Sequence, residues 1–346
     1  MAPQSLAARI PKIHLHCHLE GSMRAETFVE LARRHGVSLR YKAPVGSDRN
    51  DGTDPFRFNG LAEFLYLFAA VCRSLRDVQD FARLAAEFVR DALAQGVIYG
   101  ELFVSPSVWT FFNPNLDVRA AIEAIAGELR AARPRATFKL LPDLTRNFGP
   151  ESAMQTARLL AGMTDLDVIG VSLGGDEIRF PAALFADAFA YARAHGLRCV
   201  AHAGETGGAA SVRDAVGVLR AERIGHGIAA LQDPKVLEML GLRGIALEVC
   251  PTSNARTGTM PDGQPNAFLE LDRAGCIVTI DADDPSIFAS SIGREYALVE
   301  EVAGPEALLR YVRNAIRASF ATEAEKRTME SHLAAAIAEP PVASRS

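Results

Sequence analysis

The 346-residue sequence predicts an α/β fold, a TIM-type (β/α)8 barrel with a lid-like insertion after the first strand. Short apolar segments rich in β-branched residues alternate with longer amphipathic stretches, which is typical of parallel βαβ units. Several apolar segments are followed by metal-capable or acid/base side chains. A parallel barrel brings the carboxyl ends of its strands to one rim, whereas an open sheet, which shows the same alternation, would spread these side chains apart.

The expected strands follow one another with a helical stretch after each. They span 12–18, 97–104, 137–143, 168–173, 198–202, 223–226, 245–249 and 277–281. The stretch 80–95 illustrates the helices, because Phe81, Leu84 and Phe88 are spaced for one buried face. Gly96 follows at the position where a left-handed residue commonly ends a helix.

One segment interrupts this alternation. Residues 40–60 are rich in glycine, proline, asparagine and aspartate, and the helix expected after them carries Phe64, Leu65, Leu67 and Phe68. We expect this insertion to cover the mouth of a pocket, although for any single phenylalanine ordinary core packing is the simpler interpretation. Residues 1–338 are expected to form one domain, and 339–346 a flexible tail.

Composition and charge limit the kind of protein. Hydrophobic residues make up 49% of the chain, enough for a large core, and the net charge of −5 argues against a nucleic-acid or anionic-membrane binder. The chain has five cysteines, an odd number, and no two of them have CxxC spacing. This argues against a framework of disulfide bonds and favours a reducing compartment. The N-terminus lacks a signal-peptide pattern and apolar runs are too short for a membrane helix. We therefore expect a soluble cytoplasmic protein.

The densest chemical cluster is the segment 13–21, which contains three histidines. Because side chains alternate along a strand, His14, His16 and His18 are expected on one face. An HxH pair at a strand end can converge on zinc at about 2.0–2.1 Å, although this cluster alone leaves ordinary core histidines equally open.

Other expected strands end in similar groups, namely His202, His226, and Asp281 with Asp283 and Asp284. Burying such groups unpaired would cost several kcal/mol each, so a shared site is the simplest interpretation.

Six motifs occur in a familiar order. They are HCHLEG at 16–21, SLGGDE at 172–177, HAGE at 202–205, RIGHG at 223–227, LEVCPTSN at 247–254 and DADDP at 281–285. From about residue 11 to 330 the sequence resembles the adenosine and adenine deaminases, the barrel deaminases among the zinc amidohydrolases. No single motif is specific, but their joint occurrence is.

The resemblance implies one zinc ion per chain and a set of roles around it. The implied zinc ligands are His16, His18, His202 and Asp283. One coordination position remains for a water that would attack C6 of a 6-aminopurine with loss of ammonia. Glu205 resembles the glutamate that protonates N1, and His226 resembles the histidine that deprotonates the water. Asp284 would contact the water and N7.

The resemblance also implies a substrate pocket and one domain. The expected substrate-binding residues are His18, Glu20, Gly175, Asp284, Phe64 and Phe68. The backbone N–H of Gly175 would meet the purine, where the absence of a Cβ permits close approach. Ligands at His16 and Asp283 stand near opposite ends of the chain, so nearly its whole length must form one barrel.

The sequence departs from the family pattern at several positions. His14 stands where an acidic residue is usual, and we do not count it as a ligand. Ala282 stands where threonine or serine is commoner. Glu20 replaces an aspartate that receives the ribose 5′-hydroxyl, and HLEG forms are usual among adenine deaminases. RIGHG and LEVCPTSN are closer to the adenosine type. Adenosine, adenine and 5′-modified adenosines such as aminodeoxyfutalosine therefore remain open as substrates.

The sequence disfavours three other classes of protein. A barrel hydrolase of phosphate esters or lactones normally needs a bridging lysine, and 168–177 contains none. A binding protein without turnover would be expected to lack a ligand or the HAGE glutamate, and all are present. Cytidine-type zinc deaminases need H-x-E with PCxxC, which is absent. We expect a small purine partner, no nucleic acid and no membrane; the oligomeric state stays open.

Overall fold

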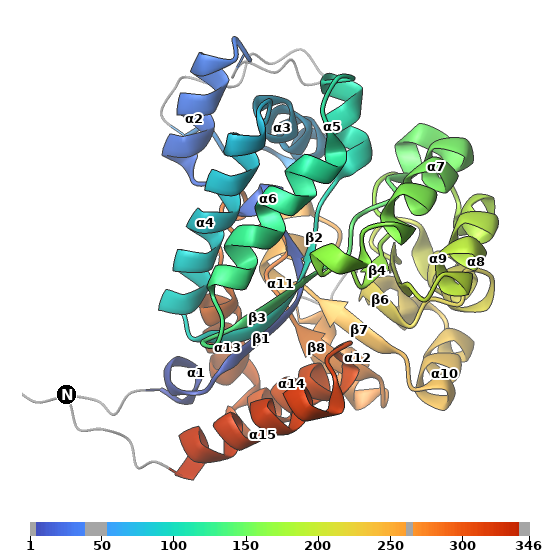
Figure 1. Cartoon of the computed structure of the whole chain (residues 1–346). Helices are drawn as coiled ribbons and strands as arrows, with labels where there is room; N and C mark the ends of the chain where they lie inside the picture. Colours follow the sequence, from blue (N-terminus) through green and yellow to red (C-terminus); the bar gives the residue numbers. More distant parts are fainter. Residues whose placement is uncertain (1–4, 39–53, 261–265, 339–346) are drawn as a thin grey trace, which may run out of the picture.

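The computed structural model describes residues 5–38, 54–260 and 266–338, so the expected tail and most of the linker 40–60 lie outside the described residues (Figure 1). The strands are β1 Lys12–His18, β2 Val97–Phe103, β3 Thr137–Leu140, β4 Gly170–Val171, β5 Arg198–Ala203, β6 Arg223–His226, β7 Ala246–Val249 and β8 Ile277–Ile280. Each expected strand is present, and every strand pairing in the described residues is parallel.

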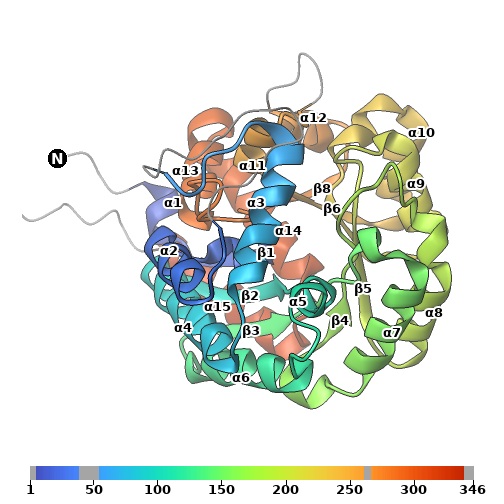
Figure 2. The same cartoon turned by 90° about the horizontal axis from the view of Figure 1, so that it is seen from above.

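Helices alternate with the strands along the chain. The α-helices are α1 Leu6–Arg9, α2 Ala25–Arg34, α3 Gly60–Ser74, α4 Val78–Ala94, α5 Pro106–Phe112, α6 Val118–Ala131, α7 Gly149–Ala161, α8 Ala186–Ala194, α9 Gly208–Gly217, α10 Pro234–Arg243, α11 Pro251–Thr257, α12 Ala267–Arg273, α13 Ile292–Ala303, α14 Pro305–Ala318 and α15 Glu323–Ala338. Short 3-10 helices are η1 Glu20–Ser22, η2 Arg146–Phe148, η3 Thr164–Leu166, η4 Ala182–Phe185 and η5 Ile228–Gln232. Seen from above, the helices are arranged around the strands (Figure 2).

The strands form two parallel sheets in sequence order. One sheet is β1-β2-β3 and the other is β4-β5-β6-β7-β8. Isolated parallel bridges join their ends: Leu140 pairs with Val168, Asp143 with Ser172, and Cys17 with Asp283. Each sheet edge therefore has a paired contact with the edge of the other sheet.

The third strand is shorter than the sequence predicts. It ends at Leu140, not at 143, because Pro142 has no amide hydrogen to donate to the ladder. Pairing resumes where Asp143 bridges Ser172, beyond β4. The fourth strand is correspondingly reduced to Gly170–Val171.

A β-bulge in β1 corrects the expectation that three histidines share one face. Between His14 and Cys17 the pairing with β2 advances three residues on β1 against two on β2, from Gly100 to Leu102. The amides of Leu15 and His16 both donate to Asp281 Oδ1, at 2.6 and 3.0 Å. One extra residue reverses the alternation, so His14 shares the face of Cys17 and lies opposite His16.

Local signals account well for the covering helices. α4 begins two residues earlier than expected, after Asp77, whose capping box with Asp80 satisfies the first amides. It ends before Gly96, which has the left-handed φ of +76° that a glycine there accommodates. Phe81, Leu84 and Phe88 are buried as the spacing predicts.

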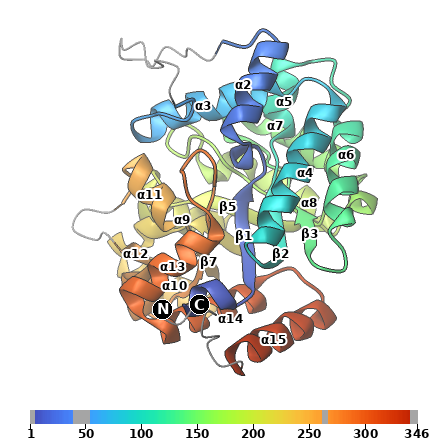
Figure 3. The ribbon, with the colours of Figure 1, turned by 90° about the vertical axis from the view of Figure 1, so that its left-hand side faces the viewer.

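α3 follows the insertion and lies beside α5 at the end of the molecule that carries α2 (Figures 1 and 3). α15 lies at the opposite end. Among the described residues, none of the helices combines the length and the apolar character that crossing a membrane requires.

Candidate active site

The predicted site residues meet at the carboxyl ends of the strands. His16 and His18 occupy the end of β1, His202 lies next to last in β5, and His226 ends β6. Asp283 follows β8 by three residues, and its carbonyl accepts the amide of His18. The alternation of strands and helices thus brings together residues more than 260 positions apart, as the sequence predicts.

Three separations among the four predicted ligand atoms suit one small cation. His18 Nε2 is 3.1 Å from His202 Nε2 and 3.4 Å from Asp283 Oδ1, and His16 Nε2 is 3.3 Å from the same oxygen. Tetrahedral ligands with bonds of about 2.0–2.1 Å are separated by roughly 3.3 Å. The donor set of imidazole nitrogens and a carboxylate, and its spacing, therefore fit a zinc-like ion.

His226 belongs to the same cluster. Two overlapping groups of donor atoms each lie within 4.8 Å of one another: His16, His202, His226 and Asp283, and also His18, Asp283 and Asp284. His226 Nε2 stands 3.9 Å from Asp283 Oδ2 and 3.7 Å from Glu205 Oε2, between the cluster and the glutamate.

The backbone at this site is held in an uncommon conformation. His226 and Asp283 have φ of 60° and 61°, in the left-handed region that residues other than glycine seldom adopt. Such conformations cost about 1–3 kcal/mol each and occur preferentially at functional sites. His226 belongs to the motif RIGHG and Asp283 to the motif DADDP, both of which were identified in the sequence.

Side chains of the LEVCPTSN segment orient the cluster. Glu248 Oε2 contacts His16 Nδ1 at 2.9 Å, and Ser253 Oγ donates to Asp283 Oδ2 at 2.6 Å. The Asn254 amide contacts His226 Nδ1 at 3.1 Å. A carboxylate on the far nitrogen of a histidine fixes the ring so that its other nitrogen faces the ion.

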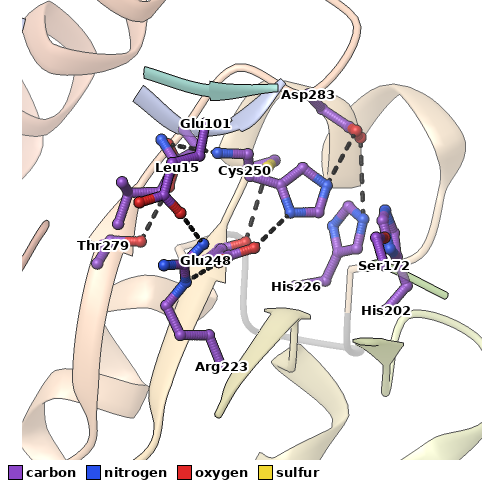
Figure 4. Close-up of polar contacts among 12 residues, drawn as sticks. Leu15, Glu101, Ser172, His202, Arg223, His226, Glu248, Cys250, Thr279 and Asp283 are labelled. Atoms are coloured by element: carbon purple, nitrogen blue, oxygen red, sulfur yellow. Dashed lines mark hydrogen bonds and ion pairs between the residues drawn. The ribbon is translucent and has the colours of Figure 1, made fainter. Parts of the chain in front are cut away.

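Behind Glu248 lies a buried ionic group (Figure 4). Arg223 donates from Nε to Glu248 and from a terminal nitrogen to Glu101, each at 2.5 Å. The ring of Phe320 lies 3.9 Å from this guanidinium. The Glu248 carboxylate thus keeps a charged partner on the side away from His16, as a buried charge requires.

Burial and neighbouring charge set the protonation of the histidines. Burial lowers the pKa of His18 to about 3 and that of His226 to about 4, and lowers the pKa of His202 well below its usual value. These rings are therefore neutral at pH 7, the form that binds a metal. Burial also opposes charge on His16, but Asp283 and Glu248 outweigh it and raise that pKa to about 10.

Several buried polar atoms of the cluster lack a hydrogen-bond partner. Among the described residues these include His16 Nε2 and Asp284 Oδ1. Because buried polar atoms are normally satisfied, an unpartnered nitrogen beside a carboxylate and two imidazoles is consistent with a bound ion.

Glu205 is positioned through its own backbone. The Glu177 carboxylate accepts the amides of Gly204, Glu205 and Thr206 at 2.8, 3.0 and 3.0 Å. Burial, with the charges of Asp283 and Glu177, raises the pKa of Glu205 well above its usual value. The Glu205 carboxyl is thereby suited to carry a proton.

Asp284 lies beside Asp283 in the same environment. Burial and then the Asp283 charge raise the pKa of Asp284 well above its usual value, while the pKa of Asp283 is lowered, against the effect of burial, by His16 and the other nearby histidines. Two neighbouring acids are thus held in different protonation states.

A cavity of about 530 Å³ opens onto this cluster. Of the residues expected to bind substrate, those that line it are His18, Phe64, Phe68, Gly175 and Asp284. α3 supplies Phe64 and Phe68, so this helix forms part of the cavity wall. The volume is typical of small-molecule sites.

Glu20 does not line the cavity. It is fully buried, and its Oε1 accepts from the Ser105 amide at 2.7 Å and from Trp109 Nε1 at 2.8 Å. The longer glutamate side chain is turned towards α5, and burial raises its pKa to about 7.

Two glycines are required by close approach. A Cβ on Gly225 would lie 2.6 Å from His16 Cε1, and a Cβ on Gly175 would lie 2.3 Å from Asn147 Oδ1. Gly175 also has a φ of +102°. A side chain at position 175 would therefore displace Asn147 and strain the backbone, so both space and conformation favour glycine there.

Sequence reasoning missed the supporting residues. Glu177, Glu248 and Asn254 stood in recognised motifs but received no role, and Asp281, grouped with the chemical residues, instead holds the β1 backbone. The signal that could have found them is burial, because a buried carboxylate or amide must have a partner.

Comparison with known proteins identifies relatives along nearly the whole chain. Residues 11–336 match the family model described as adenosine deaminase. The chain is 33% identical to adenosine deaminase of Shewanella loihica, covering 92% of this chain and 97% of that protein. It is 37% identical to adenine deaminase of Rhodospirillum rubrum (94% and 96%), and 36% identical to aminodeoxyfutalosine deaminase of Streptomyces avermitilis (93% and 90%).

Solved structures agree with these relatives. An adenine deaminase from Arthrobacter aurescens superposes with a TM-score of 0.85 at 26% identity, covering 97% of this chain and 99% of that one. An amidohydrolase from Burkhoderia ambifaria with bound Zn gives 0.81 at 25% identity (96% and 94%). Together, fold, site and relatives define a hydrolytic enzyme of the aminohydrolase class. The chain belongs to the adenosine deaminase family.

Proposed function

We propose that the protein is a zinc-dependent deaminase of 6-aminopurine nucleosides, converting adenosine or a 5′-modified adenosine to the corresponding inosine and ammonia. The observation that carries this proposal is the position of Glu205. Its carboxyl lies 3.7 Å from His226 Nε2, in the same cavity as a cluster of imidazoles and a carboxylate spaced for zinc. An acid, a base and a metal site on one reacting centre are the requirements of hydrolytic deamination.

The metal site would be formed by His16, His18, His202 and Asp283. Zinc bound there would supply Lewis acidity and lower the pKa of water towards about 7. The orientation of these ligands is supported by the contacts of Glu248 on His16 and of Ser253 on Asp283. The unpartnered His16 Nε2 supports an ion in preference to an internal hydrogen bond.

The remaining residues divide the proton transfers. His226, neutral at pH 7, would accept a proton from the attacking water at Nε2, which faces the cluster, with the Asn254 amide turned so that its oxygen accepts from Nδ1–H. Glu205, with its raised pKa, would donate a proton to N1 of the purine. Asp284, whose raised pKa favours the protonated acid, would orient the water and donate a hydrogen bond to N7, and the Gly175 amide would meet the ring.

One domain provides this geometry. The eight strands would close into a single barrel over residues 1–338, supported by the bridges Cys17 to Asp283 and Leu140 to Val168 between the two sheets. α3 would act as a lid on the barrel, because Phe64 and Phe68 line the cavity.

Adenine is the second candidate substrate. The HLEG form of the motif at 16–21 and the 37% identity to an adenine deaminase favour it. Gly225 favours the nucleoside, because adenine deaminases tend to carry an aspartate there and a Cβ at this position would overlap His16.

The test is steady-state ammonia release by zinc-loaded protein from adenosine, adenine, methylthioadenosine and aminodeoxyfutalosine. Nucleoside deamination is expected, with a higher kcat/KM than for adenine. Higher kcat/KM for adenine would establish the second candidate. Folded, zinc-loaded protein that releases no ammonia from any of the four would refute deamination altogether.

A further inference from the structure

We propose that the outer half of the cavity binds an apolar group on the 5′ carbon of the nucleoside and rejects a 5′ phosphate. This proposal rests on the proposed function, because it takes the reacting C6 to lie at the Glu205 end of the cavity. C6 and N9 lie at opposite ends of a purine, so the sugar on N9 then points away from Glu205 towards the mouth.

The cavity changes in character between these two ends. At the inner end lie buried polar residues, including His202, His226 and Asp283. At the mouth the lining side chains include Phe111, which is 63% exposed, and Ile178, which is 71% exposed. Exposed apolar side chains that gather at the rim of a pocket are a common mark of a ligand or partner site.

The apolar wall is continuous across several elements. Phe111 packs on Phe112 and Phe148, with ring centroids 5.1 and 5.3 Å apart. Leu61 and Leu65 of α3 also line the cavity. An apolar substituent on the 5′ carbon would therefore contact aromatic and aliphatic side chains. Displacing water from these side chains would contribute favourably to the binding free energy.

Charge disfavours a phosphate in the same place. Among the described residues that line the cavity there is no lysine or arginine. Of its five carboxyl groups, Glu205, Asp283 and Asp284 belong to the inner end, and the other two are Asp143 and Asp176. Arg179 pairs with Asp176 at 2.6 Å but is 72% exposed and does not itself line the cavity. Phosphate sites normally present arginine, lysine or free backbone amides, so a nucleotide would lose its hydration without compensation.

The cavity is also larger than a free base needs. Its volume of about 530 Å³ lies in the range of sites that enclose drug-sized ligands. A purine alone would leave the aromatic side chains of the cavity in contact with water. An apolar 5′ group would displace that water.

The experiment compares kcat/KM of the zinc-loaded enzyme for adenosine, 5′-methylthioadenosine and AMP. We expect about a 10-fold higher value for 5′-methylthioadenosine than for adenosine, and a value for AMP at least about 100-fold lower than for adenosine. In Phe111→Ala the preference for methylthioadenosine over adenosine should fall about 10-fold. Leu242→Ala removes an 82%-exposed leucine far from the lining residues in sequence and should leave the preference unchanged.

A second pair of variants tests the charge argument at the mouth. Ile178→Lys places a cation where a phosphate would lie and should raise the AMP-to-adenosine ratio at least about 10-fold, whereas Ile178→Gln, which is uncharged, should not. Two results would overturn this proposal while leaving deamination intact. One is a kcat/KM of the wild-type enzyme for AMP that equals or exceeds its value for adenosine. The other is an equal kcat/KM for 5′-methylthioadenosine and adenosine. Failure to release ammonia from any of the three, by folded enzyme, would instead count against the proposed function.

Discussion

Replacing Glu177 by glutamine tests whether the loop that carries Glu205 is held by one carboxylate. Both oxygens of Glu177 accept amides, one from Gly204 and the other from Glu205 and Thr206. Glutamine offers one acceptor and one donor, so at least one amide would face an N–H group. Hydrogen bonds to a charged group contribute about 1.5–3 kcal/mol each, so the variant should lose about 3 kcal/mol of stability.

This loss corresponds to a decrease in Tm of about 4 °C for a chain of 346 residues, from an unfolding entropy of about 2.1 cal/mol/K per residue. Misplacing Glu205 by about 1 Å should also lower kcat about 100-fold. The assay is thermal unfolding together with steady-state deamination well below the new Tm, with zinc content measured in parallel. Glu151→Gln, an exposed acid in the first turn of α7, is the matched control. Wild-type kcat in Glu177→Gln would refute the positioning role.

Three further predictions concern single residues of the site. Glu205→Gln should retain zinc by metal analysis but lose about 100- to 10,000-fold in kcat, and retained turnover would assign the proton donor elsewhere. Gly225→Ala should push against His16 and weaken zinc affinity about 10- to 100-fold in a chelator competition; unchanged affinity would show that the ring can move aside. Because burial raises the pKa of Glu20 from 4.5 to about 7, the folded state holds its proton more tightly, and stability should fall by about 3 kcal/mol as pH rises from 4.5 to 7. Urea unfolding should show this slope reduced in Glu20→Gln, and an identical slope would exclude Glu20 as its source.

The order of elements could be predicted because it depends on local patterns. Apolar runs located all eight strands, and Gly96 located the end of α4. The bulge in β1 could not be predicted, since it depends on Asp281 accepting two successive amides from a strand 266 positions away. His14 was therefore assigned to the wrong face.

In the candidate site, too, local motifs could be predicted from the sequence, whereas tertiary contacts could not. Residues proposed to carry the chemistry, such as His202 and Glu205, stand at or just after strand ends in recognisable motifs. Residues that orient them act through tertiary contacts: Glu177 reaches a different loop, and Glu248 reaches His16 across the fold. Glu20 was expected to face substrate because of its motif, and its longer side chain instead bonds Trp109.

Zinc-dependent deamination at this site is tested most directly by measuring zinc content and ammonia release from adenosine, in the wild-type protein and in Asp283→Ala. Asp283 lies 3.3 and 3.4 Å from His16 and His18 and is the acidic member of the proposed ligand set. We predict about one zinc per wild-type chain with conversion of adenosine to inosine, and neither in folded Asp283→Ala. Full zinc content and activity in Asp283→Ala, or a zinc-loaded wild type that leaves adenosine unchanged, would contradict it.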